Sequence, residues 1–302
     1  MKKLFIVILL PFYLLIGSKN ISILAPATPS SLPFLIASKR NDSLNTNLFM
    51  NHSKAHSKFL KKKVDILVTG LTVGKKFYDQ DIPVKIINSY VSELSYLVSA
   101  GSKINNFSEL KGKQIYLPFQ GAPLTEVTKY FSRQENLKWK KNLIPQYSPF
   151  PSTVKLLLRG KAKYAVLPEP FISNLASKNK NIHICFSYTK LWNKYSNDED
   201  GFPQVATFIK SDNKKLNTKT INTINTNLAR SIQYIQNHPE KAIQQVEKKY
   251  RFSKLILKNS LKRTNFLLHT GSKLKNEIKH YYKTIESPLD KTYQNFFLNH
   301  KK

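Results

Sequence analysis

Short apolar runs alternate along this chain with segments in which apolar residues return every three or four positions. The clearest example lies between residues 151 and 171, where a helical pattern of apolar residues starts at Val154. Gly160 follows, at a position where helices often end on a residue with positive φ. The run at residues 163–167 is then short and apolar enough to form an inner strand of a sheet. The pattern predicts a helix, a buried strand and Glu169 at the carboxyl end of that strand.

Similar apolar runs indicate a mixed α/β chain. From Lys214 onward, apolar residues keep a period of 3.6, which predicts helices in the C-terminal part. Ligands of open α/β sheets bind beyond the carboxyl ends of the strands, where loops and helix N-termini converge. The further strands that we predict lie at residues 21–25, 64–69, 83–88, 94–99, 114–117, 182–188 and 205–209.

Polar residues follow two of these predicted strands directly. Thr28, Ser30 and Ser31 come after the first strand, in a turn that opens a helix. Backbone N–H groups and hydroxyls at such a position can receive an anionic or carbonyl group. The alternative is that the two serines only cap the helix. Gly70 and Thr72 occupy the corresponding place after the strand at residues 64–69.

Two segments resemble one family of proteins. Leu110, Lys111, Gly112, Lys113 and Ile115 match an "L-K-G-K-x-I" run, and residues 160–171 match "G-K-x-D-x-A-V-L-x-E-P" followed by an aromatic. Both runs are typical of bacterial periplasmic solute-binding proteins for nitrate, sulfonates, taurine and thiamine precursors. The chain departs from that pattern within Lys163-Tyr164, where the family often has Asp, and at Ala122, where it usually has Ser or Thr.

The resemblance implies an α/β, two-lobed periplasmic binding protein type II fold. Each lobe would be a mixed sheet flanked by helices, with the ligand cleft between the lobes. We expect a signal peptide at residues 1–18, a discontinuous first lobe at residues 19–100 and 205–302, and a second lobe at residues 101–204. Two crossing segments, at about residues 99–103 and 187–204, would join the lobes.

The same resemblance implies the substrate-binding component of an ABC importer, which would deliver a small solute to a permease in the inner membrane. The solute would be an anion, a sulfonate or a heterocycle-like molecule. We expect a monomer that is not an enzyme and carries no cofactor. The alternative is an enzyme of the same fold, of the pyrimidine-precursor or menaquinone-pathway type, although an exported protein would lack cytoplasmic substrates.

Eleven residues are predicted to bind the solute. Glu169 would either accept hydrogen bonds from the ligand or clamp the backbone of its own lobe, and both roles stay open at this point. The predicted residues are Thr28, Ser30, Ser31, Gly70, Thr72 and Ser92 in the first lobe, and Gln120, Gly121, Ala122, Pro123 and Glu169 in the second.

The N-terminus has the layout of a secretory signal peptide. Lys2 and Lys3 precede an apolar run at residues 4–16, and Gly17 and Ser18 are small enough for cleavage. The run is shorter than the roughly 17–25 residues that span a bilayer. No Cys lies near its end, which excludes the lipid-modified form. We therefore predict a periplasmic protein with a cleaved signal, and an uncleaved anchor is the alternative.

The formal net charge of +31 raises the question of a nucleic-acid partner. The excess comes mainly from Lys spread along the chain, whereas nucleic-acid readers gather Arg and aromatic residues on one face. We therefore predict no nucleic-acid partner, and a basic surface protein is kept as a rival. Such a charge can still speed the capture of an anion or hold the protein near an anionic membrane.

Candidate chemistry outside the predicted cleft is sparse. His52 and His56 have the four-residue spacing of helical zinc ligands, but no nearby residue completes a ligand set, and we predict no metal. Cys185 is the single cysteine, and its apolar neighbours indicate a buried structural residue.

Overall fold

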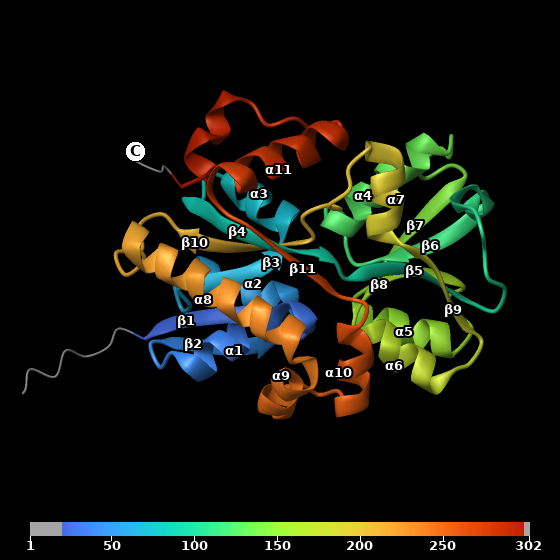
Figure 1. Cartoon of the computed structure of the whole chain (residues 1–302). Helices are drawn as coiled ribbons and strands as arrows, with labels where there is room; N and C mark the ends of the chain where they lie inside the picture. Colours follow the sequence, from blue (N-terminus) through green and yellow to red (C-terminus); the bar gives the residue numbers. More distant parts are fainter. Residues whose placement is uncertain (1–19, 299–302) are drawn as a thin grey trace, which may run out of the picture.

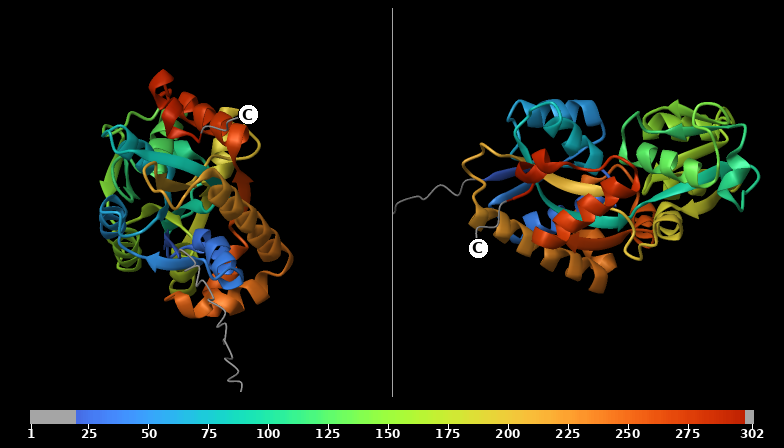
Figure 2. Two further views of the ribbon diagram at one scale, coloured as in Figure 1. Left: turned by 90° about the vertical axis from the view of Figure 1, so that its left-hand side faces the viewer. Right: turned by 90° about the horizontal axis from the view of Figure 1, so that it is seen from above.

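The computed structural model describes residues 20–298, and the predicted signal peptide lies outside them. Two mixed sheets form two lobes that lie side by side (Figure 1 and Figure 2). We call the six-stranded sheet with its helices the first lobe, and the five-stranded sheet with its helices the second lobe. The α/β fold with two sheets flanked by helices agrees with the sequence prediction.

The first lobe has the strand order β11-β4-β10-β3-β1-β2. β1 pairs in parallel with β2 and β3, while β10 and β11 pair antiparallel with their neighbours. Its strands are β1 (Ile21–Pro26), β2 (Leu44–Phe49), β3 (Ile66–Gly70), β4 (Val84–Glu93), β10 (Val205–Lys210) and β11 (Asn265–His269). Its helices are α1 (Leu32–Arg40), α2 (His52–Leu60), α3 (Leu71–Tyr78), α8 (Thr218–Asn237), α9 (Pro239–Val246), α10 (Lys254–Leu261) and α11 (Gly271–Thr284).

The second lobe has the strand order β7-β6-β8-β5-β9. β6 pairs in parallel with β7 and β8, whereas β5 runs antiparallel to β8 and β9. Its strands are β5 (Ser95–Ala100), β6 (Lys113–Leu117), β7 (Leu143–Tyr147), β8 (Tyr164–Pro168) and β9 (Ile182–Ser187). Its helices are α4 (Pro123–Gln134), α5 (Phe150–Leu158), α6 (Phe171–Lys178) and α7 (Tyr188–Ser196). Four 3₁₀ segments complete residues 20–298: Pro29–Ser31, Phe107–Leu110, Glu247–Lys249 and Lys291–Phe296.

The chain crosses between the lobes earlier than predicted. β4 and β5 are separated by Leu94 alone, so residues 95–100 belong to the second sheet and not to the first lobe. The predicted crossing at residues 99–103 is therefore replaced by one at Leu94. The return crossing lies at residues 197–204, after α7 and inside the predicted 187–204 segment. The first crossing is a single residue because β4 and β5 run up to it from both sides, whereas the second connects α7 to β10.

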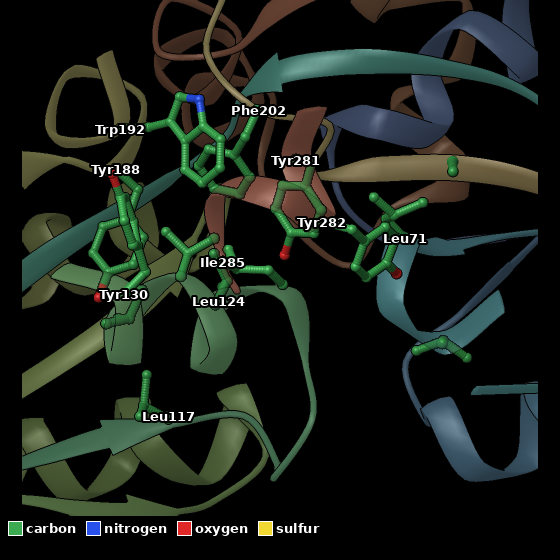
Figure 3. Close-up of a cluster of buried hydrophobic side chains, with 14 of the residues drawn as sticks. Leu71, Leu117, Leu124, Tyr130, Tyr188, Trp192, Phe202, Tyr281, Tyr282 and Ile285 are labelled. Carbon is green, nitrogen blue, oxygen red and sulfur yellow. The ribbon is translucent and has the colours of Figure 1, made fainter. Parts of the chain in front are cut away.

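The C-terminal segment touches both lobes. On one side, Phe252 meets Phe171 of α6 at a ring-centroid distance of 5.7 Å. On the other side, Tyr281 of α11 stacks on Trp192 of α7 at 5.4 Å. Figure 3 shows this second contact as part of a buried aromatic cluster that draws on both lobes. We call Tyr130, Trp192, Phe202 and Tyr281 the Trp192 cluster. The lobes are thus held together by packing as well as by the crossing segments.

Candidate functional site

A cavity of about 850 Å³ lies between the two lobes. In the first lobe its lining residues follow the ends of β1, β2 and β3, which are parallel to one another. In the second lobe they follow the ends of β6, β7 and β8, which are also parallel. The carboxyl edges of both sheets therefore face one shared space, which is where open α/β sheets bind ligands.

The structure brings seven of the eleven predicted residues to this space. Four of them line the main cavity, and Thr28 also reaches a smaller cavity of about 80 Å³ beside it. Contact with a solute stays a prediction for all seven. The main cavity is lined by Thr28, Thr72, Gln120 and Gly121, and the smaller one by Gly70, Ala122 and Pro123.

Ser30, Ser31 and Ser92 line neither cavity, in contrast to the prediction. Ser30 Oγ lies 2.7 Å from Thr28 Oγ1, and Ser31 Oγ donates to the Thr28 carbonyl oxygen at 2.8 Å, so neither hydroxyl caps the following helix. Ser92 Oγ accepts a hydrogen bond from the Asn265 side chain at 2.8 Å. All three side chains are buried and have partners within the protein.

Glu169 is also absent from the cavity lining. Its carboxylate is completely buried, and Arg263 Nε donates to Glu169 Oε1 at 2.5 Å. Glu169 Oε2 accepts from the Ser173 N–H at 3.0 Å, which ties the carboxylate to the first turn of α6. Of the two predicted roles, the geometry therefore shows the clamp on its own lobe. Glu169 also forms an ion pair with Arg263, in the connection between α10 and β11, which the sequence did not indicate.

The two lobes touch each other at the floor of the cleft. Thr72 Oγ1, in the first lobe, donates to the Gly121 carbonyl oxygen of the second lobe at 2.7 Å. Beside it, a Cβ added to Gly70 would lie 2.8 Å from Pro123 Cγ. Only glycine permits so close an approach, since real Cβ atoms do not come nearer than about 3 Å to another heavy atom. The described conformation is thus one in which the lobes are in contact.

Aromatic side chains that sequence reasoning missed form the walls of the cavity. His52 of α2 lies between the lobes, with ring centroids 6.1 Å from Phe119 and 6.5 Å from Phe150. His52, Phe119 and Phe150 are half-buried, so part of each ring is accessible. The other aromatic lining residues are Phe49, His56, Phe77 and Phe171. The available signal was position, because Phe49, Phe119 and Phe150 each lie within three residues of a strand end.

Solved structures similar to this chain include proteins described as transport components. An ABC transporter structure from Parabacteroides distasonis is 19% identical with a TM-score of 0.74, covering 94% of this chain and 100% of that one. The aliphatic sulphonate binding protein SsuA from Escherichia coli is 13% identical with a TM-score of 0.72, covering 89% and 86%. A Candida albicans protein described as exhibiting the generic periplasmic binding protein structural fold is 14% identical with a TM-score of 0.65, covering 92% and 96%. The chain has the periplasmic binding protein fold. No protein-family model and no curated protein sequence matches it.

Within this periplasmic binding protein fold, two histidines of the cleft are held neutral. Burial lowers the pKa of His52 to about 4. Burial, with His52 as a second cause, lowers the pKa of His56 to about 4. His56 Nε2 lies 3.4 Å from Thr69 Oγ1, and His52 Nδ1 has no partner among residues 20–298. In that same range no group of three or more His, Cys, Asp or Glu side chains is arranged to hold a metal ion.

The depressed pKa values predict a loss of stability in mild acid. The unfolded chain binds protons at these two histidines below about pH 6.5, whereas the folded chain binds them only near pH 4, so protonation favours unfolding across that window. We expect the midpoint of thermal unfolding to fall between pH 7 and pH 4.5. His52→Gln with His56→Gln should flatten this dependence, while the exposed His238→Gln should not. If the unfolding midpoint depends on pH equally in the wild type and the double variant, the loss of stability in acid does not come from His52 and His56.

The part of the chain that the structure describes contains no helix both long and apolar enough to cross a membrane. Cys185 was predicted to be a buried structural residue, but it is only half-buried, and its Sγ donates to Ser99 Oγ at 3.3 Å. It lies on β9, away from the cavity lining.

Proposed function

We propose that this protein captures a small solute in the interlobe cleft and delivers it to an ABC permease in the inner membrane. It acts outside the cytoplasm, after export through the predicted signal peptide, as a monomer that does not convert its solute chemically. Among the solute classes implied by the sequence, the aromatic walls favour one that contains a ring.

The observation that carries this proposal is the position of the cavity. Six parallel strand ends, three from each sheet, open onto one space that only the pair of lobes encloses. A solute in that space touches both lobes and therefore stabilises the conformation in which they are in contact. Hinge closure around a ligand gives a membrane partner two distinguishable shapes to recognise. The similar structures from transport support the same role.

A cleft-blocking variant tests the proposal. Ser152 is exposed and lines the cavity, so Ser152→Trp places a large ring where the solute would lie. Ser177 is an exposed serine on α6 that does not line the cavity, and Ser177→Trp is the matched control. We expect a solute that raises the unfolding temperature of the wild type and of Ser177→Trp to leave Ser152→Trp unchanged. A ligand at 100 times its Kd stabilises a protein by about 2.7 kcal/mol.

The same experiment separates binding from catalysis. After long incubation with the protein, the solute should be recovered chemically unchanged by mass spectrometry. Conversion of the solute would favour the enzyme alternative. An equal thermal shift in both tryptophan variants would place binding outside the cleft and refute the proposal.

A further inference from the structure

The walls of the cavity are built to contact a flat ring. His52 belongs to the first lobe, whereas Phe119 and Phe150 belong to the second. The His52 ring is tilted against Phe119 and edge-on to Phe150. Each is half-buried in the described structure. Aromatic pairs prefer offset or edge-to-face contacts at centroid distances of about 4.5–7 Å, and such pairs add roughly 0.5–1.5 kcal/mol beyond their buried area. An aromatic solute would gain these contacts from both lobes at once.

The charge of the cavity lining has one sign. Among the described lining residues there is no Asp, Glu or Arg, and Lys76 is the single Lys. Lys76 lies on α3, is exposed and makes no ion pair within residues 20–298. His52 and His56 are neutral at neutral pH. An ammonium group would find no carboxylate here, whereas an anionic group would find a free cation.

Two helix N-termini, one in each lobe, add to the positive electrostatic potential of the cavity. The first turn of α3, whose N-cap is Gly70, reaches the cavity at Thr72, and α5 begins at the cavity with Pro149 as its N-cap. Neither helix has a side-chain cap or an acidic residue in its first turn. The positive ends of both helix dipoles therefore lack a negative partner from the protein. The two helix ends thus have the same sign as the charge of Lys76, and both favour an anionic solute.

We propose that the solute is a flat aromatic compound that carries an anionic group of the carboxylate or sulfonate kind. The ring lies against His52, Phe119 and Phe150, and the anionic group lies toward Lys76. This inference rests on the proposed function, since it names the solute of the same cleft. A bare inorganic anion would make no apolar contact with the accessible parts of these rings. An aliphatic aminosulfonate would bring an ammonium group to a cavity without acidic side chains.

A set of five probes tests both halves of the inference. Benzoate and benzenesulfonate have the ring and the charge, cyclohexanecarboxylate has the charge without a flat ring, benzamide has the ring without the charge, and benzylamine has the opposite charge. We expect the two aromatic anions to raise the unfolding temperature at millimolar concentration. By calorimetry, each of the other three should bind at least about tenfold more weakly, which is 1.4 kcal/mol.

Substitutions then locate the two contacts. Lys76→Met should weaken benzoate binding about fivefold or more while leaving benzamide binding unchanged. Lys58→Met is the matched control, because Lys58 is exposed on α2 and outside the cavity, and its loss changes the net charge equally. Phe150→Leu keeps the apolar volume but removes the ring, and should weaken both benzoate and benzamide.

The outcomes separate this inference from the proposed function. Binding of nitrate, taurine or benzamide as tight as that of benzoate, or no thermal shift with either aromatic anion, overturns the aromatic-anion assignment. If another solute still binds in a way that Ser152→Trp abolishes, the cleft remains the binding site. If Lys58→Met and Lys76→Met weaken benzoate binding equally, the effect comes from the net charge of the protein and not from a contact with Lys76. This result would also overturn the assignment.

Discussion

Replacing Arg263 with Ala is expected to lower the free energy of unfolding by about 3 kcal/mol. The substitution leaves the Glu169 carboxylate completely buried without its cationic partner. It also removes the hydrogen bond that Arg263 Nη2 donates to Ser173 Oγ at 2.7 Å. The penalty arises from the stranded charge, since breaking a buried pair from one side costs more than the pair contributes.

Denaturant titration of matched variants checks this result. Arg251→Ala, at an exposed arginine three residues before α10, should change the stability by less than about 0.5 kcal/mol. Glu169→Gln keeps the shape of the side chain without its charge, and it should cost less than Arg263→Ala. A loss below about 1 kcal/mol for Arg263→Ala would show that the ion pair does not hold the C-terminal segment to the second lobe.

Replacing Trp192 with Ala is expected to cost about 3–5 kcal/mol. Trp192 is completely buried and contacts Tyr281 at 5.4 Å, Phe202 at 5.3 Å and Tyr130 at 5.6 Å between ring centroids. The substitution empties the centre of the Trp192 cluster, shown in Figure 3. Because Tyr281 lies on α11 and Trp192 on α7, the cavity opens where the C-terminal segment meets the second lobe.

The second tryptophan supplies the control for this substitution. Trp139 is only half-buried and packs at the margin of the same hydrophobic core, so Trp139→Ala should cost clearly less. Chemical denaturation followed by circular dichroism measures both variants without relying on tryptophan fluorescence. Equal losses for Trp139→Ala and Trp192→Ala would contradict the view that the Trp192 cluster joins the lobes.

Local patterns along the chain predicted many elements, because their signals lie within a few residues. Residues 163–167 were expected as a buried strand and form β8 (Tyr164–Pro168), followed as expected by a carboxylate at its end. The strand at residues 205–209 is β10 (Val205–Lys210). In both segments a short apolar run lies between polar turns, so its period and length are enough to predict a strand.

Three strands were missed because their sequences lack that signal. β2 (Leu44–Phe49) lies at an edge of the first sheet, and Asn and Thr interrupt its apolar residues. β7 (Leu143–Tyr147) lies at an edge of the second sheet and contains Pro145. β11 (Asn265–His269) lies in the part expected to be helical, and its pairing with β4 is irregular. Edge strands are specified by their neighbours more than by their own residues.

Missing β2 and β7 also hid the walls of the cleft. His52 follows β2 and Phe150 follows β7, so neither residue could be placed at a sheet edge without those strands. The strands before Thr28, Thr72 and Gln120 were recognised, and all three residues line the cavity. Glu169 lies outside the cavity lining for a different reason. Its partner Arg263 lies 94 residues away, and no local pattern records a long-range ion pair.

A crystal structure of the protein with a solute that raises its unfolding temperature would show whether the solute binds between the lobes. We expect electron density for the solute in the cavity between the lobes, in contact with residues of both, such as His52 and Phe119. Density only outside this space, with the cavity filled by solvent, would contradict the claim that the facing strand ends form the solute-binding site.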